Sequence, residues 1–383
     1  MRLFVLVALS GAAGLVYQSL WMRSFGLVFG NTTDAVAFVL SAFMGGLALG
    51  GFLVARRPAP RPLEAYARVE IGIAATALVS WPLLRALPAA YGALAGRISL
   101  DGPLESLGRG LAAGVLVMPT AVLLGATVPL VVAHLTRSGR GFHRVLGRLY
   151  LVNTLGGAAG VALGPFVLVP ALGLSGTLLA AAGLNAVIGG VALRLSRDVE
   201  RVAGPGTRPA GGRAPGPPIP ALFPALAFAS GAFSFAVEVL WTRSLVLVIG
   251  SSVYSFHLVL LAVLLGIASG TAVYERLRPR VARPRLWLGS LLATTGLLSL
   301  AGVFVLGWLP EAFLALVRAL PVSFAAHQAA GFALSLAALL PVTLVLGLTF
   351  PLLAHLLASE TDAQRASGLL YGWNTAGAIV GAV

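Results

Sequence analysis

The sequence predicts an all-α, polytopic membrane helix bundle built from two parallel copies of one helical unit. Three observations carry this prediction: the apolar composition, the placement of the arginines, and an internal repeat. Of 383 residues, 58% are hydrophobic and 10% are charged. The apolar residues fall in blocks of about 20, the length that crosses a bilayer as a helix. Between the blocks lie only short Arg, Pro and Gly stretches, so no soluble catalytic domain is expected.

The charge pattern predicts an orientation in the membrane. All 26 basic residues are arginine, against 12 acidic residues. Such a surplus can indicate a nucleic-acid partner, but here the arginines gather in alternate loops, as the positive-inside rule describes. The groups lie within residues 56–68, 137–148, 194–213 and 276–285. We therefore predict a multi-pass protein of the inner (plasma) membrane with a cytoplasmic N-terminus, lipid as its partner, and no nucleic-acid partner.

About 11 helices are expected. Their predicted spans lie near 3–22, 34–55, 69–91, 110–135, 147–169, 172–194, 221–242, 253–275, 286–309, 329–357 and from 367 to the end. Glycine inside these spans lets neighbouring backbones approach closely, and Gly46-x-x-x-Gly50 predicts one such packing face. Residues 195–220 are rich in Pro, Gly and Arg and are interpreted as a flexible cytoplasmic linker. The predicted units are therefore 1–194, the linker 195–220, and 221–383.

The two units repeat each other in sequence. Leu20-Trp21-Met22-Arg23-Ser24 recurs as Leu240-Trp241-Thr242-Arg243-Ser244, a shift of 220 that also superposes Gly46 on Gly266 and Gly50 on Gly270. Because the first unit holds six helices, the second begins on the same side, and the repeats run parallel. Parallel repeats of this kind are the architecture of major facilitator transporters. The counterpart of about Gly164 to Arg194 is missing after Val383, which predicts that the second repeat is incomplete and the chain a fragment.

Three stretches carry a family resemblance. They are Ser10-Gly11-Ala12-Ala13-Gly14-Leu15-Val16-Tyr17-Gln18 through Trp21-Met22-Arg23, Gly45-Gly46-Leu47-Ala48-Leu49-Gly50, and Leu149-Tyr150-Leu151-Val152-Asn153-Thr154-Leu155-Gly156. The sequence resembles the membrane portion of the bacterial fused major-facilitator and spermidine-synthase-like proteins. The resemblance implies a membrane domain followed by a cytoplasmic aminopropyltransferase-like domain that uses decarboxylated S-adenosylmethionine.

That soluble domain does not occur within these residues. The sequence has no Gly-x-Gly-x-x-Gly turn, no Ser/His/Asp order and no His-Glu-x-x-His, and it has no cysteine. We expect no catalytic residues, no bound cofactor and no metal site in this chain. The glycine-Asp-Arg loop usual after the second facilitator helix is reduced here to Gly51 through Arg56-Arg57, without the Asp.

Polar side chains inside the predicted helices are the candidate contacts for a solute. Glu238 is costly in a membrane unless it is paired or faces water, and its repeat counterpart is Gln18. Two interpretations remain open for it: it neutralises a cationic amine or carries a coupling proton, or it pairs near the surface with Arg23 or Arg243. Trp21 and Trp241, with the two arginines, are interpreted as an aromatic belt with snorkelling cations, or alternatively as an anion site.

The remaining candidates are one histidine and two repeated pairs. Asn153 with Thr154, and Asn374 with Thr375, either hydrogen-bond between helices or face a central cavity. His257 is interpreted as a proton relay or a packed core residue. Glu70 is expected to form a solvated pair beside Arg68, and His134 and His355 are each expected to stand alone.

Three functions follow as hypotheses. The first is the membrane domain of a spermidine-synthase-like fusion protein, which positions a transferase domain (C-terminal or separate) and conducts a cationic polyamine or related small solute. The second is a stand-alone secondary transporter of the major-facilitator type. The third is a scaffold that transports nothing.

Overall fold

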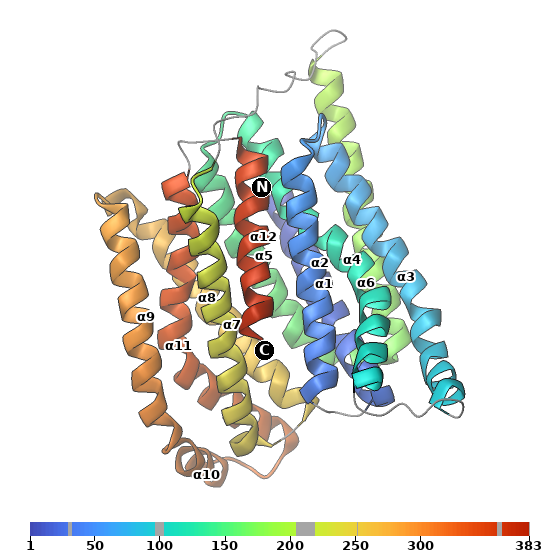
Figure 1. Ribbon diagram of the computed structural model, residues 1–383, viewed down its shortest axis with the longest axis vertical. Helices are drawn as coiled ribbons and strands as arrows, with labels where there is room; N and C mark the ends of the chain where they lie inside the picture. Colours follow the sequence, from blue (N-terminus) through green and yellow to red (C-terminus); the bar gives the residue numbers. More distant parts are fainter. Residues whose placement is uncertain (30–32, 96–102, 204–218, 251, 358–361, 383) are drawn as a thin grey trace.

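The computed structural model describes the chain except for residues 30–32, 96–102, 204–218, 251, 358–361 and 383 (Figure 1). The residues N-terminal to 204 form α1 (Arg2–Phe29), α2 (Thr33–Arg56), α3 (Pro62–Ala95), α4 (Pro103–Arg137), α5 (Phe142–Leu163), the π-helical turn η1 (Gly164–Leu168) and α6 (Val169–Ala203). The residues C-terminal to 218 form α7 (Leu222–Ile249), α8 (Val253–Leu277), the 3₁₀ turn η2 (Arg278–Arg280), α9 (Pro284–Leu306), α10 (Leu309–Ala319), α11 (Phe324–Leu357) and α12 (Ala363–Gly381). We call these two sets the first and second halves.

The all-α membrane bundle is confirmed. Every regular element in the described part of the chain is helical. Within that part, nine stretches are long and apolar enough to cross a membrane, and one of them, Phe142–Val199, contains both α5 and most of α6. The fifth and sixth predicted helices join there through η1, and the backbone turns at Gly173, where φ is 68°. A positive φ is what glycine alone adopts without strain, so this residue permits the turn. The chain is a multi-pass membrane protein.

Two details differ from the sequence prediction. Helix α6 continues to Ala203, so the first part of the predicted linker is helical, while residues 204–218 lie outside the described residues. The short helix α10 was not predicted, because its 11 residues are too few to cross a bilayer. It lies across the lower end of the bundle in Figure 1.

The long helices run between two ends of the molecule, and the arginine groups gather at one of them. The N-terminus, the α2–α3 and α4–α5 connections and the end of α8 share the upper end in Figure 1. We call this end the arginine-rich face and the other end the opposite face. Helices α1 and α7 both begin at the arginine-rich face, so they run in the same direction.

The repeat recurs in the packing between α2 and α4 and between α8 and α11. A methyl group added at Gly50 would lie 2.0 Å from the carbonyl oxygen of Val122, and one at Gly270 would lie 1.9 Å from that of Leu344. Gly125 and Gly347 approach Leu47 and Ile267 in the same way. These contacts relate residues that the sequence repeat pairs. Only glycine permits such approach of backbones, which confirms the packing face predicted from Gly46 and Gly50.

The same correspondence holds for α1 with α5 and for α7 with α12. A methyl at Gly156 would lie 1.9 Å from the Ala8 oxygen, and one at Gly377 would lie 1.9 Å from the Phe228 oxygen. Residues 8 and 228 are again related by the shift of 220, and 156 and 377 by the shift of 221. The two halves therefore repeat each other in three dimensions, contact by contact.

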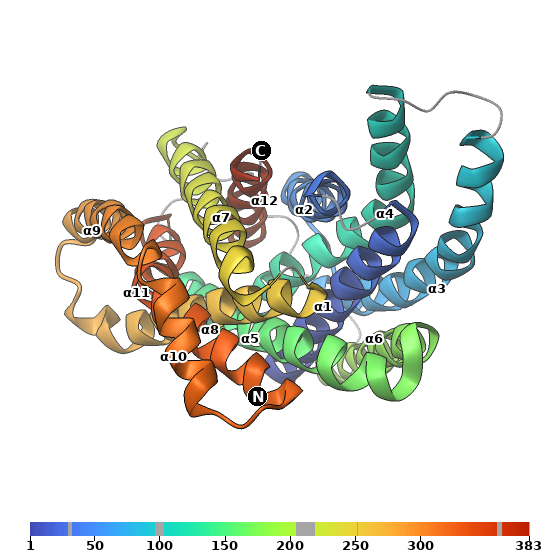
Figure 2. The same ribbon diagram turned by 90° about the horizontal axis from the view of Figure 1, so that it is seen from below.

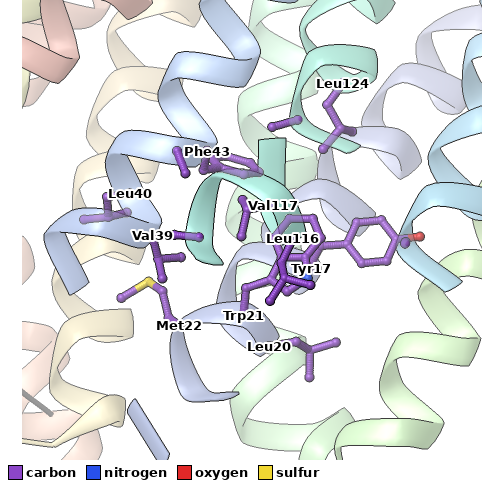
Figure 3. Packing of buried hydrophobic residues seen from close by; sticks show 14 of the residues in the cluster. Tyr17, Leu20, Trp21, Met22, Val39, Leu40, Phe43, Leu116, Val117 and Leu124 are labelled. Atoms are coloured by element: carbon purple, nitrogen blue, oxygen red, sulfur yellow. The ribbon is translucent and has the colours of Figure 1, made fainter. Parts of the chain in front are cut away.

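The predicted aromatic belt is wrong. Trp21 is 0% exposed and Trp241 is 7% exposed, because α1 and α7 continue past them to Phe29 and Ile249. Figure 3 shows Trp21 in an apolar cluster between Tyr17 and Phe43. Its indole N–H donates to Ser80 of α3, and the Trp241 ring contacts Gly302 of α9. Each tryptophan joins the first helix of its half to the third.

Candidate functional site

The two halves meet along a seam formed by α2 with α12 and by α5 with α8, as Figure 2 shows from below. At the arginine-rich face, the end of α2 lies against the start of α12. A methyl group added at Gly51 would lie 3.0 Å from the carbonyl oxygen of Gly368 and 3.1 Å from the amide nitrogen of Gly372, closer than ordinary van der Waals contact. The close approach requires residues without side chains on both helices.

Gln364 is the polar centre of this contact. Its side chain is buried, its Nε2 donates to the carbonyls of Val54 at 2.9 Å and Arg57 at 3.1 Å, and its Oε1 accepts from the amide of Ala59 at 3.2 Å. The Val54 carbonyl needs this partner because residue 58 is a proline and has no N–H to continue the helix. One residue of the second half thus caps α2 of the first.

A charged contact lies on the other side of the seam, between the start of α5 and the end of α8. Glu275 accepts from Arg278 at 2.9 Å, and Arg148 of the first half lies 3.8 Å from the same carboxylate. The Glu275 and Arg278 side chains are only 13% and 14% exposed, and the Arg148 side chain is 60% exposed. A screened, partly exposed pair between the halves contributes little energy and can break and re-form.

His355 does not stand alone, contrary to the sequence prediction. Its ring stacks on His143 of α5 with centroids 5.1 Å apart, and its Nδ1 shares a hydrogen bond of 2.8 Å with Tyr274 of α8. The partner was missed because His143 is distant in sequence and follows no motif. Two imidazoles are fewer than a metal site needs, and the described residues contain no group of three His, Asp or Glu that could hold an ion.

Apolar contacts complete the closure at this face. Tyr150 of α5 stacks on Phe350 of α11 with centroids 4.6 Å apart. One continuous buried cluster includes Val145 and Leu146 from the first half with Ala366 and Leu370 from the second. The seam is therefore sealed at the arginine-rich face by apolar packing, one charged contact and the Gln364 cap.

Glu238, the acidic candidate, lies on α7 between residues that pack against the first half and residues that pack within the second. Phe235 and Val239, three residues before it and one after, pack against the cluster built on α1, α2 and α4. The Glu238 side chain is half-buried. Neither Arg23 nor Arg243 lies within 4 Å of its carboxylate to form an ion pair, and Arg243 is exposed.

Arg23 and His257 are polar candidates on α1 and α8. Arg23 is half-buried, and His257 is 1% exposed. The histidine Nδ1 lies 2.6 Å from the Val253 carbonyl, so this nitrogen carries the proton, and Nε2 has no hydrogen-bond partner. Gln18, the repeat counterpart of Glu238, is buried in α1.

The repeated Asn and Thr pairs join helices within each half. Asn374 donates to the Ala227 carbonyl of α7 at 3.2 Å, and the backbone and side chain of Asn153 lie against Gly11 of α1. Thr154 and Thr375 donate to carbonyls of their own helices, four residues earlier. In this structure all four side chains serve helix packing.

The prediction for Glu70 is wrong. Arg68 pairs with Glu64 of the same helix, and Glu70 is 0% exposed inside the first half. The expected pair of Glu70 with Arg68 does not form because residues two apart on a helix point in different directions. Asn185 of α6 donates to Glu70 at 2.6 Å and accepts from Tyr17 of α1 at 2.9 Å.

Comparisons with known proteins agree with this architecture. No protein-family model and no curated protein matches the sequence. Among solved structures, a bacterial homologue of the iron transporter ferroportin, in an outward-facing state with soaked iron, matches with a TM-score of 0.61 and 16% identity, over 100% of this chain and 90% of that one. The major facilitator superfamily proton:xylose symporter XylE, bound to 6-bromo-6-deoxy-D-glucose, matches with a TM-score of 0.55 and 14% identity, over 99% of this chain and 86% of that one. The chain has the major-facilitator fold.

Proposed function

We propose that this protein is a secondary transporter in which the two halves rock about the seam and expose a site between them to each face in turn. The observation that carries the proposal is the closure of the arginine-rich face. The halves meet there through the Gln364 cap, the Glu275 contact and close-packed glycines, all of which join one half to the other. In transporters made of two such repeats, alternating access is largely a rigid-body rocking of one half against the other.

The solute we propose is a small organic cation, a polyamine or a related amine. Glu238 lies next to residues of α7 that pack against the first half, and it forms no ion pair with any described residue. An unpaired carboxylate in a membrane interior is expensive unless a cation or a proton meets it. His257 of α8, a helix of the seam, has a buried Nε2 without a hydrogen-bond partner. A carboxylate with no described cation of the protein within 4 Å can accept the ammonium group of a solute.

Replacing Glu238 with glutamine is expected to abolish amine uptake and leave the fold intact. The protein would be reconstituted in liposomes. Uptake of radiolabelled spermidine and putrescine would be measured with and without a pH gradient across the liposome membrane. Glu311→Gln on the exposed surface of α10 is the matched control and should transport normally. Uptake by the Glu238→Gln protein at the wild-type rate would remove the carboxylate from the mechanism.

The sequence resemblance supports a second proposal, that the bundle also positions an aminopropyltransferase-like domain. Such a domain would lie on the cytoplasmic side, which we infer to be the arginine-rich face of the inner membrane with the N-terminus inside. The intact mass of the native gene product, purified from membranes, decides it. A mass well above 39.1 kDa, with peptides from a Gly-rich strand-turn-helix segment, is the expected result. A mass equal to that of this chain would refute a fused domain, and the absence of any co-purifying transferase would then refute a separate one.

A further inference from the structure

Glu70 occupies a second polar site, inside the first half and away from the seam. It lies in α3, eight residues after Pro62, so helix geometry puts it about 12 Å below the arginine-rich face. Its side chain is fully buried between α1, α3 and α6. The nearest arginine in sequence, Arg68, turns outward to Glu64.

The surroundings of Glu70 are polar but carry no positive charge. Asn185 of α6 donates to Oε2 at 2.6 Å, and the hydroxyl groups of Ser10 from α1 and Tyr66 from α3 lie beside the carboxylate. The titratable groups that face it are Tyr17 of α1 and Tyr66 of α3, and the described residues of α4 and α6 add no charged group. Neither Glu70 Oε1 nor Tyr66 Oη completes a hydrogen bond.

This arrangement fits a carboxylic acid and not a carboxylate. An ionised carboxylate that is 0% exposed and has no counter-ion is among the most costly groups in a protein interior. A proton on Oε1 removes the charge and supplies a donor for the hydroxyl oxygen of Tyr66 or Ser10, while Oε2 keeps the bond from Asn185. Donated to Tyr66 Oη, this proton gives both unpaired atoms a partner and leaves no buried charge.

We propose that Glu70 is an exchangeable proton site that gains and loses its proton during the transport cycle, an inference that rests on the transport function proposed above. Release leaves a carboxylate that must meet water, which requires α1 to move from α3 and α6. Helix α1 packs along α5, and α5 forms the seam with α8, so movement of α1 is transmitted to the contact between the halves. The proton is taken up from water and returned to it; no other reactant is needed.

Infrared spectroscopy of the purified full chain in lipid nanodiscs tests the site directly. The carbonyl band of a protonated carboxyl group should be present in wild type, lost in Glu70→Gln and retained in Glu64→Gln, the matched control earlier on α3. Tyr66→Phe should shift the band without removing it. Raising the pH should remove the carbonyl band of Glu70, and lowering the pH again should restore it. A spectrum of Glu70→Gln identical to wild type, or a band that no pH change alters, overturns the proposal.

Liposome uptake then separates this site from the transport function itself. In Glu70→Gln, accumulation driven by a pH gradient should be lost, while exchange of labelled for unlabelled amine across the membrane should persist. Gradient-driven accumulation at the wild-type rate in Glu70→Gln would overturn the role of the proton in transport. Failure of the transport function would look different: wild type would move no amine in either assay, while its Glu70 band would still titrate.

Discussion

A Gly50→Ala protein is expected to lose about 1–3 kcal/mol of unfolding free energy, the cost of overpacking a close-packed interior. The added methyl group would lie 2.0 Å from the Val122 carbonyl oxygen, which is backbone and cannot rotate away. Helices α2 and α4 would have to separate along their length. Because Gly270 occupies the same place between α8 and α11, Gly270→Ala should cost a similar amount.

The matched control is Gly114→Ala within α4, where an added methyl meets nothing within 4 Å. Alanine is the better helix former by up to about 1 kcal/mol, so this variant should be unchanged or slightly more stable. Unfolding in mixed micelles with increasing SDS gives the three free energies. Equal stability of Gly50→Ala and Gly114→Ala would show that the backbone approach between α2 and α4 is not as close as described.

Replacing Gln364 with alanine is expected to open the arginine-rich face. The change leaves the Val54 and Arg57 carbonyls and the Ala59 amide without the partners they have now, at a cost of about 1–3 kcal/mol to the closed state. In the open state water can satisfy them. Since each 1.4 kcal/mol is about tenfold, the open population should rise about 5- to 150-fold.

Alkylation of a single introduced cysteine measures this population. The chain has no cysteine of its own, so Ala366→Cys, buried on α12 beside the cap, provides one reactive thiol. Alkylation should be slow alone and much faster when combined with Gln364→Ala. Gln328→Ala, at a half-buried position near the start of α11, is the control and should leave the rate unchanged. Equal rates for all three proteins would mean that Gln364 does not hold the face closed.

The fold was predictable from the sequence because its determinants are local or repeated. A bilayer fixes helix length, so apolar blocks reveal helices directly. The shift of 220 between Gly50 and Gly270 marks positions where only glycine fits, and the structure places both in the same kind of backbone contact. Helix α10 was not predicted because it is short and does not form an apolar block long enough to cross a membrane.

The candidate site was less predictable because its contacts join residues far apart in the chain. Gln364 acts on α2 only because Pro58 deprives Val54 of a helical partner, which neither position reveals alone. Glu70 looked like half of a surface pair until helix geometry separated it from Arg68. The informative feature was the spacing of four between Glu64 and Arg68, which lets these two residues pair on one face of the helix. Glu70 then lies on another face, without Arg68 as a partner.

The most direct test of alternating movement is a pair of distances measured by double electron–electron resonance on the cysteine-free background. One pair of spin labels at Leu27 and Leu247, which are 73% and 88% exposed, spans the opposite face. A second pair at Ser138 and Arg280, both exposed, spans the arginine-rich face. As pH and amine are varied, one distance should lengthen while the other shortens. Two distances that stay fixed, or that lengthen together, would contradict rocking of the halves about the seam.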